Sequence, residues 1–250
     1  MSDTVLVEDQ GAVRVLTLNR PTKLNAMNVE MVDTLIGAVR AADLDDAVAV
    51  VILTAAGRAF SAGADISRGT TEPSPRQVIG RARGMATLFR ALSECTKPVV
   101  AAVHGYVLGG ACSLAMSCDL VVAADNAVFG YPELKAGLAA TAVAPVLVQQ
   151  IGRKAAFELL TLCENVNAER ALALGMINRV VPRDDLLSEA SRMSEQLAAF
   201  NHDALWMTKR TIQRAASMSP ADALEMAGDA SLVMRLLPPT GSRVESGPRV

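Results

Sequence analysis

The sequence predicts an α/β fold in which short strands alternate with helices, and two observations carry this prediction. Residues 47–53 (AVAVVIL) and 98–103 (PVVAAV) are continuous apolar runs, typical of strands buried on both faces. Apolar residues at helical spacing separate these runs, over about residues 75–92. The alternation indicates stacked α/β units that are joined by right-handed connections.

The remaining elements follow in chain order. Residues 4–18 contain two β-rich runs around a glycine turn, which predict a hairpin. A helix is expected next, from four apolar residues spaced three or four apart: Met31, Leu35, Val39 and Ala42. Residues 119–124 (DLVVAA) predict a further strand.

The last third of the chain is predicted to be mainly helical. Helical patterns dominate after Pro145, a short strand follows Gly175, and a helix is expected over residues 203–216. Residues 237–250 are rich in Pro, Gly and Ser and predict irregular structure. We therefore divide the chain into a core, 1–195, and a helical C-terminal region, 196–250, which we expect to serve packing or oligomerisation.

Composition excludes several classes of function. The 250 residues carry a net charge of -2 and only 3% aromatic residues, which argues against a nucleic-acid partner. The four cysteines form no CxxC pair and have no histidines at metal-ligand spacing, so we expect reduced, buried thiols and no metal site. His104 and His202 are interpreted as structural residues.

The N-terminal segment carries acidic residues and no long apolar run, which favours a cytoplasmic protein. One uncharged window, residues 98–118, has the length of a membrane span. Its paired glycines, its histidine and its place among amphipathic helices favour a buried strand followed by a buried helix. We therefore expect no membrane partner.

Two glycine-containing loops are the candidate functional elements. In FSAGADIS (60–67), Gly63 permits a sharp turn and close approach of a ligand to backbone amides. In GYVLGGACS (105–113), Gly109 and Gly110 are expected to open a helix, whose free N–H groups and dipole favour an anion. Each signal is weak alone, because tight packing also selects glycine.

These loops belong to a longer series of motifs that resembles the crotonase, or enoyl-CoA hydratase/isomerase, family. The motifs cover most of the chain: NRPTKLNAMN, AGRAFSAGADI, KPVVAAVHGYVLGGACSLAMSCDLVVAA, FGYPELKAGL, GRKAAFELL and ALALGMINRVV. The resemblance implies a crotonase-like spiral of ββα units with a helical C-terminal trimerisation region, assembled as a homotrimer or a dimer of trimers. It also implies an acyl-CoA thioester substrate, with coenzyme A arriving as part of the substrate and no separate cofactor.

The resemblance assigns an oxyanion hole to two backbone amides, those of Ala64 and Gly110. Proton removal beside a thioester, or nucleophilic addition to its conjugated alkene, develops an enolate whose charge sits on the thioester oxygen. Two preorganised donors stabilise that charge, each by about 3 kcal/mol in the transition state. Small residues suffice, because no side chain takes part.

The resemblance also assigns residues to coenzyme A and the acyl group. The loop from Ala62 to Ile66 matches the segment that holds the adenine end, and Thr141 and Val143 are expected to line the acyl pocket. The substrate-binding residues predicted in this way are Lys23, Leu24, Ala62, Asp65, Ile66, Gly109 and Thr141. Four arginines either steer the CoA phosphates or form a solvated helix face: Arg68, Arg76, Arg81 and Arg83. The C-terminal tail does not match the CoA-contacting helix of the family.

The sequence departs from the family at one catalytic position. Hydratases of the family carry two glutamates, which correspond to Ser113 and Glu133, so this chain keeps one carboxylate of the pair. The family's single-glutamate isomerases keep the carboxylate that corresponds to Glu133. We therefore expect Glu133 to be the acid/base, with a raised pKa, and we favour double-bond isomerisation over hydration. The alternatives are a hydratase or a non-catalytic acyl-CoA-binding member.

Both residues at these positions also have simpler interpretations. Glu133 follows a proline and could cap a helix. Ser113 could bind water or the acyl chain, or could fill space. A nucleophilic role for Ser113 is disfavoured, because the sequence has no G-x-S-x-G elbow and no histidine–carboxylate pair around the serine.

Overall fold

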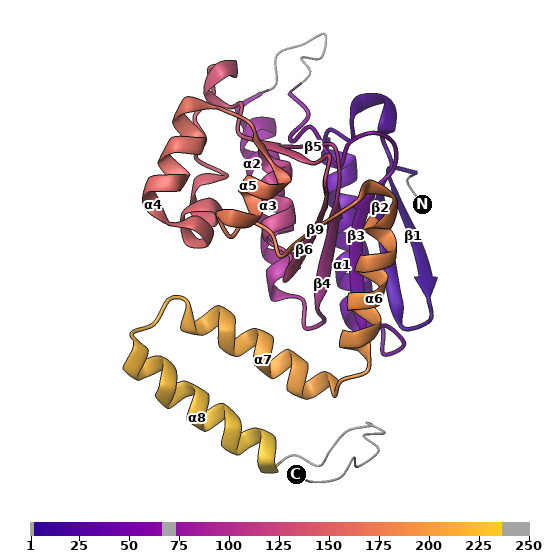
Figure 1. Cartoon of the computed structure of the whole chain (residues 1–250), viewed down its shortest axis with the longest axis vertical. Coiled ribbons are helices and arrows are strands. Elements are labelled where there is room, and N and C mark those ends of the chain that lie inside the picture. Colours follow the sequence, from indigo (N-terminus) through magenta and orange to yellow (C-terminus); the bar gives the residue numbers. More distant parts are fainter. Residues whose placement is uncertain (1–2, 67–73, 237–250) are drawn as a thin grey trace.

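A six-stranded sheet forms the centre of the protein, for which the computed structural model describes residues 3–66 and 74–236 (Figure 1). Its strand order is β1-β2-β3-β4-β6-β9, with one antiparallel pair, β1 with β2, and parallel pairing elsewhere. The strands are β1 (Val5–Gln10), β2 (Val13–Leu18), β3 (Val50–Ala55), β4 (Val99–Val103), β6 (Leu120–Ala124) and β9 (Arg179–Val181). The predicted α/β fold class and the N-terminal hairpin are confirmed.

Helices cover both faces of this sheet, which explains the continuous apolar runs. The helices of the core are α1 (Val29–Leu44), α2 (Pro75–Glu94), α3 (Gly110–Met116), α4 (Ala144–Leu162), α5 (Ala168–Ala173) and α6 (Leu186–Ala198), with 3-10 turns η1 (Pro21–Lys23), η2 (Leu134–Ala136) and η3 (Arg183–Asp185). In β3, Val50 and Ile52 pack in the cluster that contains α6, whereas Val51 and Leu53 pack with α1 and α2. Alternate residues of one strand thus enter two cores.

The strand β3 begins three residues later than the apolar run predicts. The reason is a turn at the end of α1, where the Ala47 amide bonds the Asp45 carboxylate at 3.0 Å and the Val48 amide bonds the Asp45 carbonyl at 3.0 Å. A side-chain acceptor of this kind favours a turn over an extended chain.

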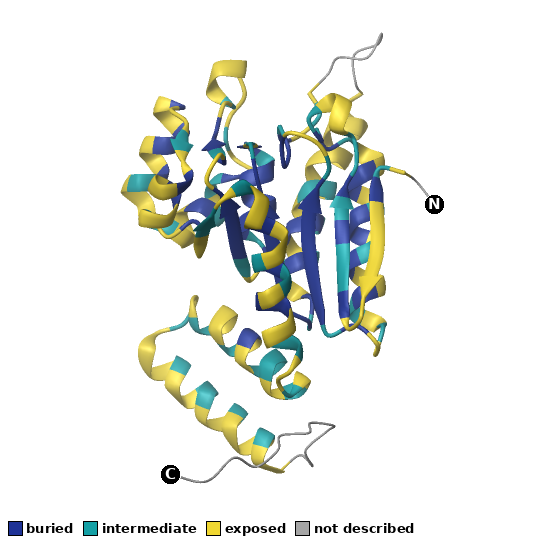
Figure 2. Ribbon diagram, turned by 45° about the vertical axis from the view of Figure 1, so that its right-hand side comes forward, coloured by how far each residue is buried: buried dark blue, intermediate teal, exposed yellow. Residues whose placement is uncertain are grey.

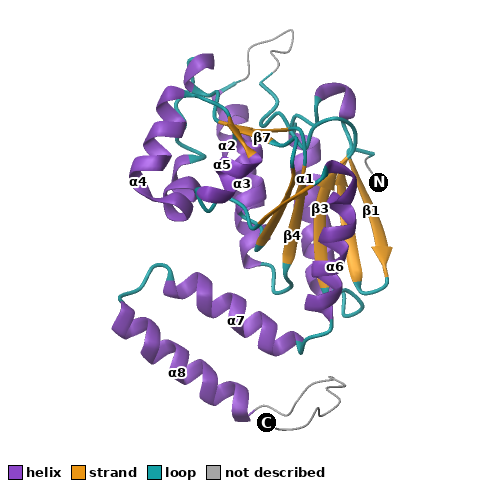
Figure 3. Ribbon diagram, in the orientation of Figure 1, coloured by secondary structure: helices purple, strands orange, loops and turns teal. Residues whose placement is uncertain are grey.

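A second, three-stranded sheet lies beyond one end of the large sheet (Figure 3). Its strands are β5 (Tyr106–Leu108), β7 (Val128–Gly130) and β8 (Val166–Asn167), in the order β5-β7-β8. The sequence patterns do not predict these strands, because two or three residues are too few for a periodic signal. This sheet carries the glycine pair and the segment that leads to Glu133.

The C-terminal region is helical, as predicted. Helices α7 (His202–Ala215) and α8 (Pro220–Leu236) run beside each other, apart from the sheet (Figure 1), and most of their surface is exposed (Figure 2). The predicted boundary at residue 195 falls inside α6, whose Leu197 and Ala198 still pack on the core. The predicted irregular tail, 237–250, lies outside the described residues.

A buried ion pair fastens α7 to the core. The Lys209 ammonium donates to the Asp119 carboxylate at 2.7 Å and to the Lys97 carbonyl at 3.0 Å. Burial raises the pKa of Asp119, and the charge of Lys209 opposes that rise. The same carboxylate oxygen accepts the Val99 amide at the start of β4, at 2.8 Å.

All four cysteines are free and buried, as expected. Among the residues the structure describes, no helix has both the length and the apolar character needed to span a membrane.

The first prediction concerns the Lys209–Asp119 pair. Lys209→Met should lower the free energy of unfolding by about 2 to 3 kcal/mol, because it leaves a buried carboxylate unpaired. Urea denaturation measures this loss. The double variant Asp119→Asn/Lys209→Met should recover most of it, whereas Arg214→Met, at an exposed position of α7, should change stability by less than about 0.5 kcal/mol. Equal losses in the single and double variants would contradict the assignment.

Candidate active site

Backbone hydrogen bonds join the two glycine-containing loops. The Phe60 amide donates to the His104 carbonyl at 2.7 Å, and the Ser61 amide donates to the Tyr106 carbonyl at 3.0 Å. The Leu108 amide completes the ladder by donating to the Ser61 carbonyl at 3.0 Å. The loops, more than forty residues apart in sequence, therefore act as adjacent strands.

A buried asparagine, Asn25, holds the first glycine-containing loop (60–67) by hydrogen bonds. Asn25 is fully buried, and its side-chain amide donates to the carbonyls of Ala56 and Ala59 at 2.8 and 2.9 Å. Its own carbonyl accepts the Ser61 hydroxyl at 2.8 Å, and that hydroxyl accepts the Gly63 amide at 3.1 Å. This network fixes the turn that precedes Ala64.

Gly63 permits the close approach of the two loops. Its φ is +92°, and a Cβ atom added there would lie 2.6 Å from the Leu108 carbonyl oxygen and 3.5 Å from the Gly110 nitrogen. The Ala64 nitrogen lies 3.9 Å from the position of a Cβ atom on Gly110. The amides of Ala64 and Gly110 therefore belong to one small region of backbone.

Neither of these two amides is used by the fold. Met27 and Asp65 make the backbone bonds on either side of Ala64, and Gly110 is the first residue of α3, where the N–H has no intrahelical acceptor. Within residues 3–66 and 74–236, no hydrogen bond is made by the amide of Ala64 or of Gly110. Two unpaired donors thus lie together, as the predicted oxyanion hole requires.

The Glu133 carboxylate faces the glycine pair. A Cβ atom on Gly109, whose φ is +54°, would lie only 2.7 Å from Glu133 Oε1. Burial raises the pKa of Glu133, because the charged form loses its hydration. Glu133 occupies the N-cap position of η2, but its side chain makes no cap hydrogen bond there.

Glu133 and its chain neighbour Tyr131 both have a buried side-chain oxygen without a hydrogen-bond partner, and so does Ser113. In the described part of the chain five buried side-chain atoms lack a hydrogen bond, and three of them are Ser113 Oγ, Tyr131 Oη and Glu133 Oε2. Burial raises the pKa of Tyr131 and raises that of Cys112 to about 12, and the charge of the nearby Glu133 adds to both rises. An unpartnered buried polar group costs about 1 to 3 kcal/mol. Unpartnered oxygens at Glu133 and Tyr131 therefore favour a polar binding site at this carboxylate.

Part of the predicted CoA site is brought together. The Ala62 amide donates to the Leu24 carbonyl at 2.9 Å, and Asp65 pairs with Arg20 at 3.0 Å. Lys23 and Ile66 are exposed at the surface near this loop. These placements leave the predicted contacts with CoA as a hypothesis.

Other predicted residues are less directly placed. Thr141 is exposed, whereas its neighbour Val143 is buried in the core. Three of the four predicted arginines, Arg76, Arg81 and Arg83, lie on α2 and are exposed, and Arg68 lies outside the described residues. His104 is buried, with its Nε2 2.9 Å from the Gly57 carbonyl oxygen and its Nδ1 without a hydrogen-bond partner.

The sequence patterns missed three contributors to the site. The methyl carbons of Met85 and Met27 lie 3.0 and 3.6 Å from the position of a Cβ atom on Gly110. Lys135, two residues after Glu133, donates to the Cys163 carbonyl at the end of α4, at 2.6 Å. Methionine and surface lysine carry no motif signal. Met27 and Lys135 lie within two residues of Asn28 and Glu133, but Met85 has no such neighbour in the sequence.

The described residues contain no group of three or more His, Cys, Asp or Glu side chains placed to hold a metal ion.

The fold and the site define a class, the crotonase-type α/β proteins, and comparison with known proteins gives the family. The sequence profile of enoyl-CoA hydratase/isomerase matches residues 8–235. A probable enoyl-CoA hydratase of Rhizobium meliloti is 35% identical, over 89% of this chain and 86% of that protein. A short-chain-enoyl-CoA hydratase of Clostridium acetobutylicum is 35% identical, over 85% of this chain and 82% of that protein. The chain belongs to the enoyl-CoA hydratase/isomerase family.

Solved structures agree with this result. The crystal structure of an enoyl-CoA hydratase of Mycobacterium smegmatis superposes with a TM-score of 0.90 at 32% identity, covering 95% of this chain and 93% of that one. The predicted family and its crotonase fold are confirmed, and the chain is an enzyme of this family that processes acyl-CoA.

The second prediction concerns the pH dependence of stability. The pKa of Glu133 is raised in the folded protein, so protonation of Glu133 favours the folded state. This contribution to stability is fully present when the pH is below the unfolded-state pKa of about 4.3. That contribution is lost as the pH rises through the folded-state pKa. Glu133→Gln, which cannot ionise, should therefore gain stability relative to the wild type as the pH rises from about 4 towards neutrality. Urea denaturation at several pH values measures the difference, and a difference independent of pH would contradict it.

Proposed function

We propose that the enzyme isomerises the double bond of an enoyl-CoA thioester, with Glu133 as its acid/base. The observation that carries this proposal is one partly buried carboxylate beside two unpaired backbone amides. The position of a second family glutamate holds Ser113, so no second carboxylate shares the work. Coenzyme A enters with the substrate, and the proposal requires no other cofactor.

Each step of this reaction has a group to perform it. The Glu133 carboxylate takes a proton from C2 of a 3-enoyl thioester, and the electron pair moves onto the thioester oxygen. The Ala64 and Gly110 amides stabilise the resulting enolate by hydrogen bonds. Protonated Glu133 then returns the proton to C4, which leaves the double bond between C2 and C3. A raised pKa suits a group that must both accept and donate the proton near neutral pH.

Hydration of a 2-enoyl thioester is the second candidate. Two of its supports are the names of the relatives from Rhizobium meliloti and Clostridium acetobutylicum, both enoyl-CoA hydratases. A third is the buried Ser113 hydroxyl, which has no hydrogen-bond partner and is suited to binding a water molecule. In this alternative Glu133 activates water for attack at C3. A family member that binds acyl-CoA without turnover is the third alternative.

We also propose a homotrimer or a dimer of trimers, assembled through the C-terminal helices. Helix α8 exposes four large apolar side chains: Leu224, Leu232, Val233 and Leu236. Exposed apolar surface of this kind is typical of subunit interfaces.

The third prediction tests Glu133 directly. Glu133→Gln should lower kcat by about 100- to 10,000-fold, because the amide cannot move a proton. The dissociation constant of a saturated acyl-CoA, measured by calorimetry, should stay unchanged. Assays with 3-enoyl-CoA and 2-enoyl-CoA esters, with mass detection of added water, separate isomerisation from hydration. The matched control is Glu158→Gln, at an exposed position of α4. Full turnover by Glu133→Gln on both esters would contradict the assignment of Glu133 as the acid/base.

The fourth prediction tests the missing carboxylate. Ser113→Glu should raise hydration of 2-enoyl-CoA relative to isomerisation, by at least about tenfold, because a second acid/base group typically contributes that much or more. Ser113→Ala is the control for loss of the hydroxyl, and thermal unfolding checks that the buried glutamate is tolerated. An unchanged product ratio in a folded Ser113→Glu variant would count against the two-carboxylate explanation.

A further inference from the structure

An arginine, Arg20, contacts the loop that carries the Ala64 amide. Its guanidinium donates to the Asp65 carboxylate at 3.0 Å and also to the Ala26 carbonyl. The Arg20 and Asp65 side chains are only 20% and 16% exposed, so this ion pair is largely shielded from water. Arg20 thus joins two segments that are far apart in the sequence.

Backbone hydrogen bonds continue from this arginine to Ala64. The Ala26 carbonyl and the Met27 amide belong to one peptide group, and the Met27 amide donates to the Gly63 carbonyl at 2.8 Å. The Gly63 carbonyl in turn shares a peptide group with the Ala64 amide. A continuous chain therefore runs from the guanidinium, through two peptide groups, to the unpaired Ala64 N–H.

This chain sets the direction of the Ala64 N–H. In a planar trans peptide group the C=O and the N–H point in opposite directions, and the described residues contain no cis peptide bond. Because the Gly63 carbonyl faces the Met27 amide, the Ala64 N–H points away from the Met27 backbone. A second bond, from the Asp65 amide to the Met27 carbonyl at 2.9 Å, holds the other side of Ala64.

We propose that Arg20 is a positioning residue for the oxyanion hole, which orients and polarises the Ala64 amide through this chain, and that Asp65 holds the guanidinium in place. The inference rests on the proposed function, because it requires the Ala64 amide to bind the thioester oxygen. It applies to isomerisation and to hydration alike, since both reactions develop an enolate. Hydrogen bonds in series strengthen one another by about 10–30% per bond, so a charged donor at the outer end makes the Ala64 N–H a stronger donor.

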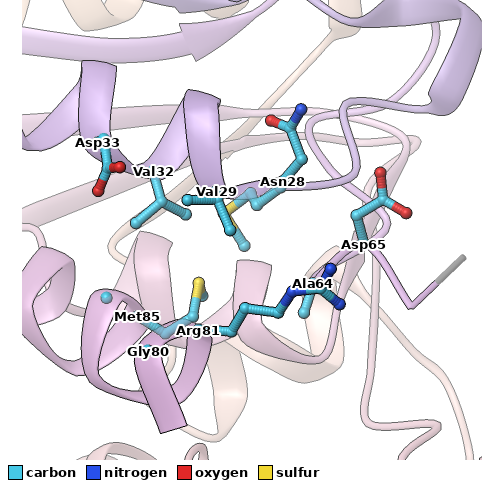
Figure 4. A pocket seen from close by; sticks show the side chains of 11 residues that line it. Asn28, Val29, Val32, Asp33, Ala64, Asp65, Gly80, Arg81 and Met85 are labelled. Atoms are coloured by element: carbon cyan, nitrogen blue, oxygen red, sulfur yellow. The ribbon is translucent and has the colours of Figure 1, made fainter. Parts of the chain in front are cut away.

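Arg20 acts without touching the substrate. Ala64 and Asp65 lie next to each other on the wall of a cavity, and the Asp65 carboxylate is directed away from Val29 and Met85, which line the same cavity (Figure 4). Arg20 does not line it. Asp65 also offsets the guanidinium charge at long range, so the contribution of Arg20 reaches the thioester through the hydrogen-bonded chain.

The kinetics of an Arg20→Met variant test the effect on the transition state. Removal of a whole oxyanion donor costs about 100- to 1,000-fold in kcat, so a weakened and misdirected donor should cost at least about tenfold. KM should change by less than about threefold, because the interaction is made mainly in the transition state. Arg20→Lys keeps the charge but not the planar, two-armed donor, so its kcat should fall between those of Arg20→Met and the wild type.

The infrared spectrum of a bound thioester supplies a readout that a loss of stability does not change. The probe is butyryl-CoA labelled with a heavy isotope at the carbonyl carbon, bound to the folded protein without turnover. Hydrogen bonds to a carbonyl oxygen lower its stretching frequency, so the wild type should shift the band below its position in solution. Arg20→Met should lose part of this shift, and Arg20→Lys should lose a smaller part.

Arg14→Met is the matched control. Arg14 pairs with Asp9 at 2.7 Å and with Asp45 at 2.8 Å, and its side chain is 12% exposed. It lies near the start of β2, whereas Arg20 follows the end of that strand. Arg14→Met should lower thermal stability and leave kcat and the carbonyl band unchanged. The double variant Arg20→Met/Asp65→Ala should lose less activity than the product of the two single losses, because coupled residues do not act additively.

Three results would overturn the inference. If Arg20→Met lowers stability but leaves kcat and the carbonyl band at their wild-type values, the ion pair only stabilises the fold. If it weakens free CoA and butyryl-CoA equally with an unchanged band, the pair serves CoA binding. Multiplicative losses in the double variant would contradict a shared role for the two residues. If Arg20→Met does not fold, the same measurements on Arg20→Lys decide.

The wild type separates this inference from the proposed function. If the wild type binds butyryl-CoA without any shift of the carbonyl band, the oxyanion hole itself is rejected, and the inference with it. If it binds no CoA thioester at all, the proposed function is rejected. A band that shifts in the wild type and shifts equally in Arg20→Met rejects the role of Arg20 alone.

Discussion

The backbone ladder between the two glycine-containing loops is the constraint on which the site depends. The ladder uses the amides of Ser61 and Leu108, and the Gly109 amide bonds the Gly130 carbonyl at 2.8 Å in continuation of it. It leaves the amides of Ala64 and Gly110 without acceptors. Each loop must also come within contact distance of a neighbour, and the positive φ values of Gly63 and Gly109 make that approach possible. The unpaired donors are therefore a consequence of how the loops pair, and no side chain is needed to create them.

The same geometry brings the carboxylate to the amides. Gly109 leaves room for Glu133 Oε1, and the short strand pairing of β5 with β7 holds the two segments in register. Beyond Glu133, Lys135 ties the segment to the end of α4. The site is thus assembled from four pieces of chain that are separate in sequence. Two methionine side chains fill the space above Gly110, where adaptable packing suits a position that must admit a ligand.

The sequence predicted the parts of this arrangement that have long or specific signals. The runs at 47–53 and 98–103 predicted strands buried on both faces. Successive residues of a strand point to opposite faces of the sheet, and in these runs all of them are apolar. The three-residue strands were not predictable, since their pairing is decided by contacts between distant segments. Asn25 shows the same limit: its motif was recognised, but its role as the partner of Ser61 depends on burial and on a left-handed backbone. The exposure of Thr141 likewise follows from the path of its loop, which local pattern does not determine.

In the proposed reaction, a serine at position 113 bears on the ionisation of Glu133 as well as on the number of catalytic groups. When two carboxylates share a site, each raises the pKa of the other by repulsion. Here the rise in the pKa of Glu133 comes from burial, and no neighbouring carboxylate contributes to it. A lone carboxylate is therefore easier to ionise than one of a pair in the same surroundings. A carboxylate must be ionised before it can remove a proton from carbon, the first step of the proposed isomerisation, whereas hydration also needs a proton donor at C2. Under the proposed function, a serine at position 113 thus affects both the number of acid/base groups in the site and the pKa of Glu133.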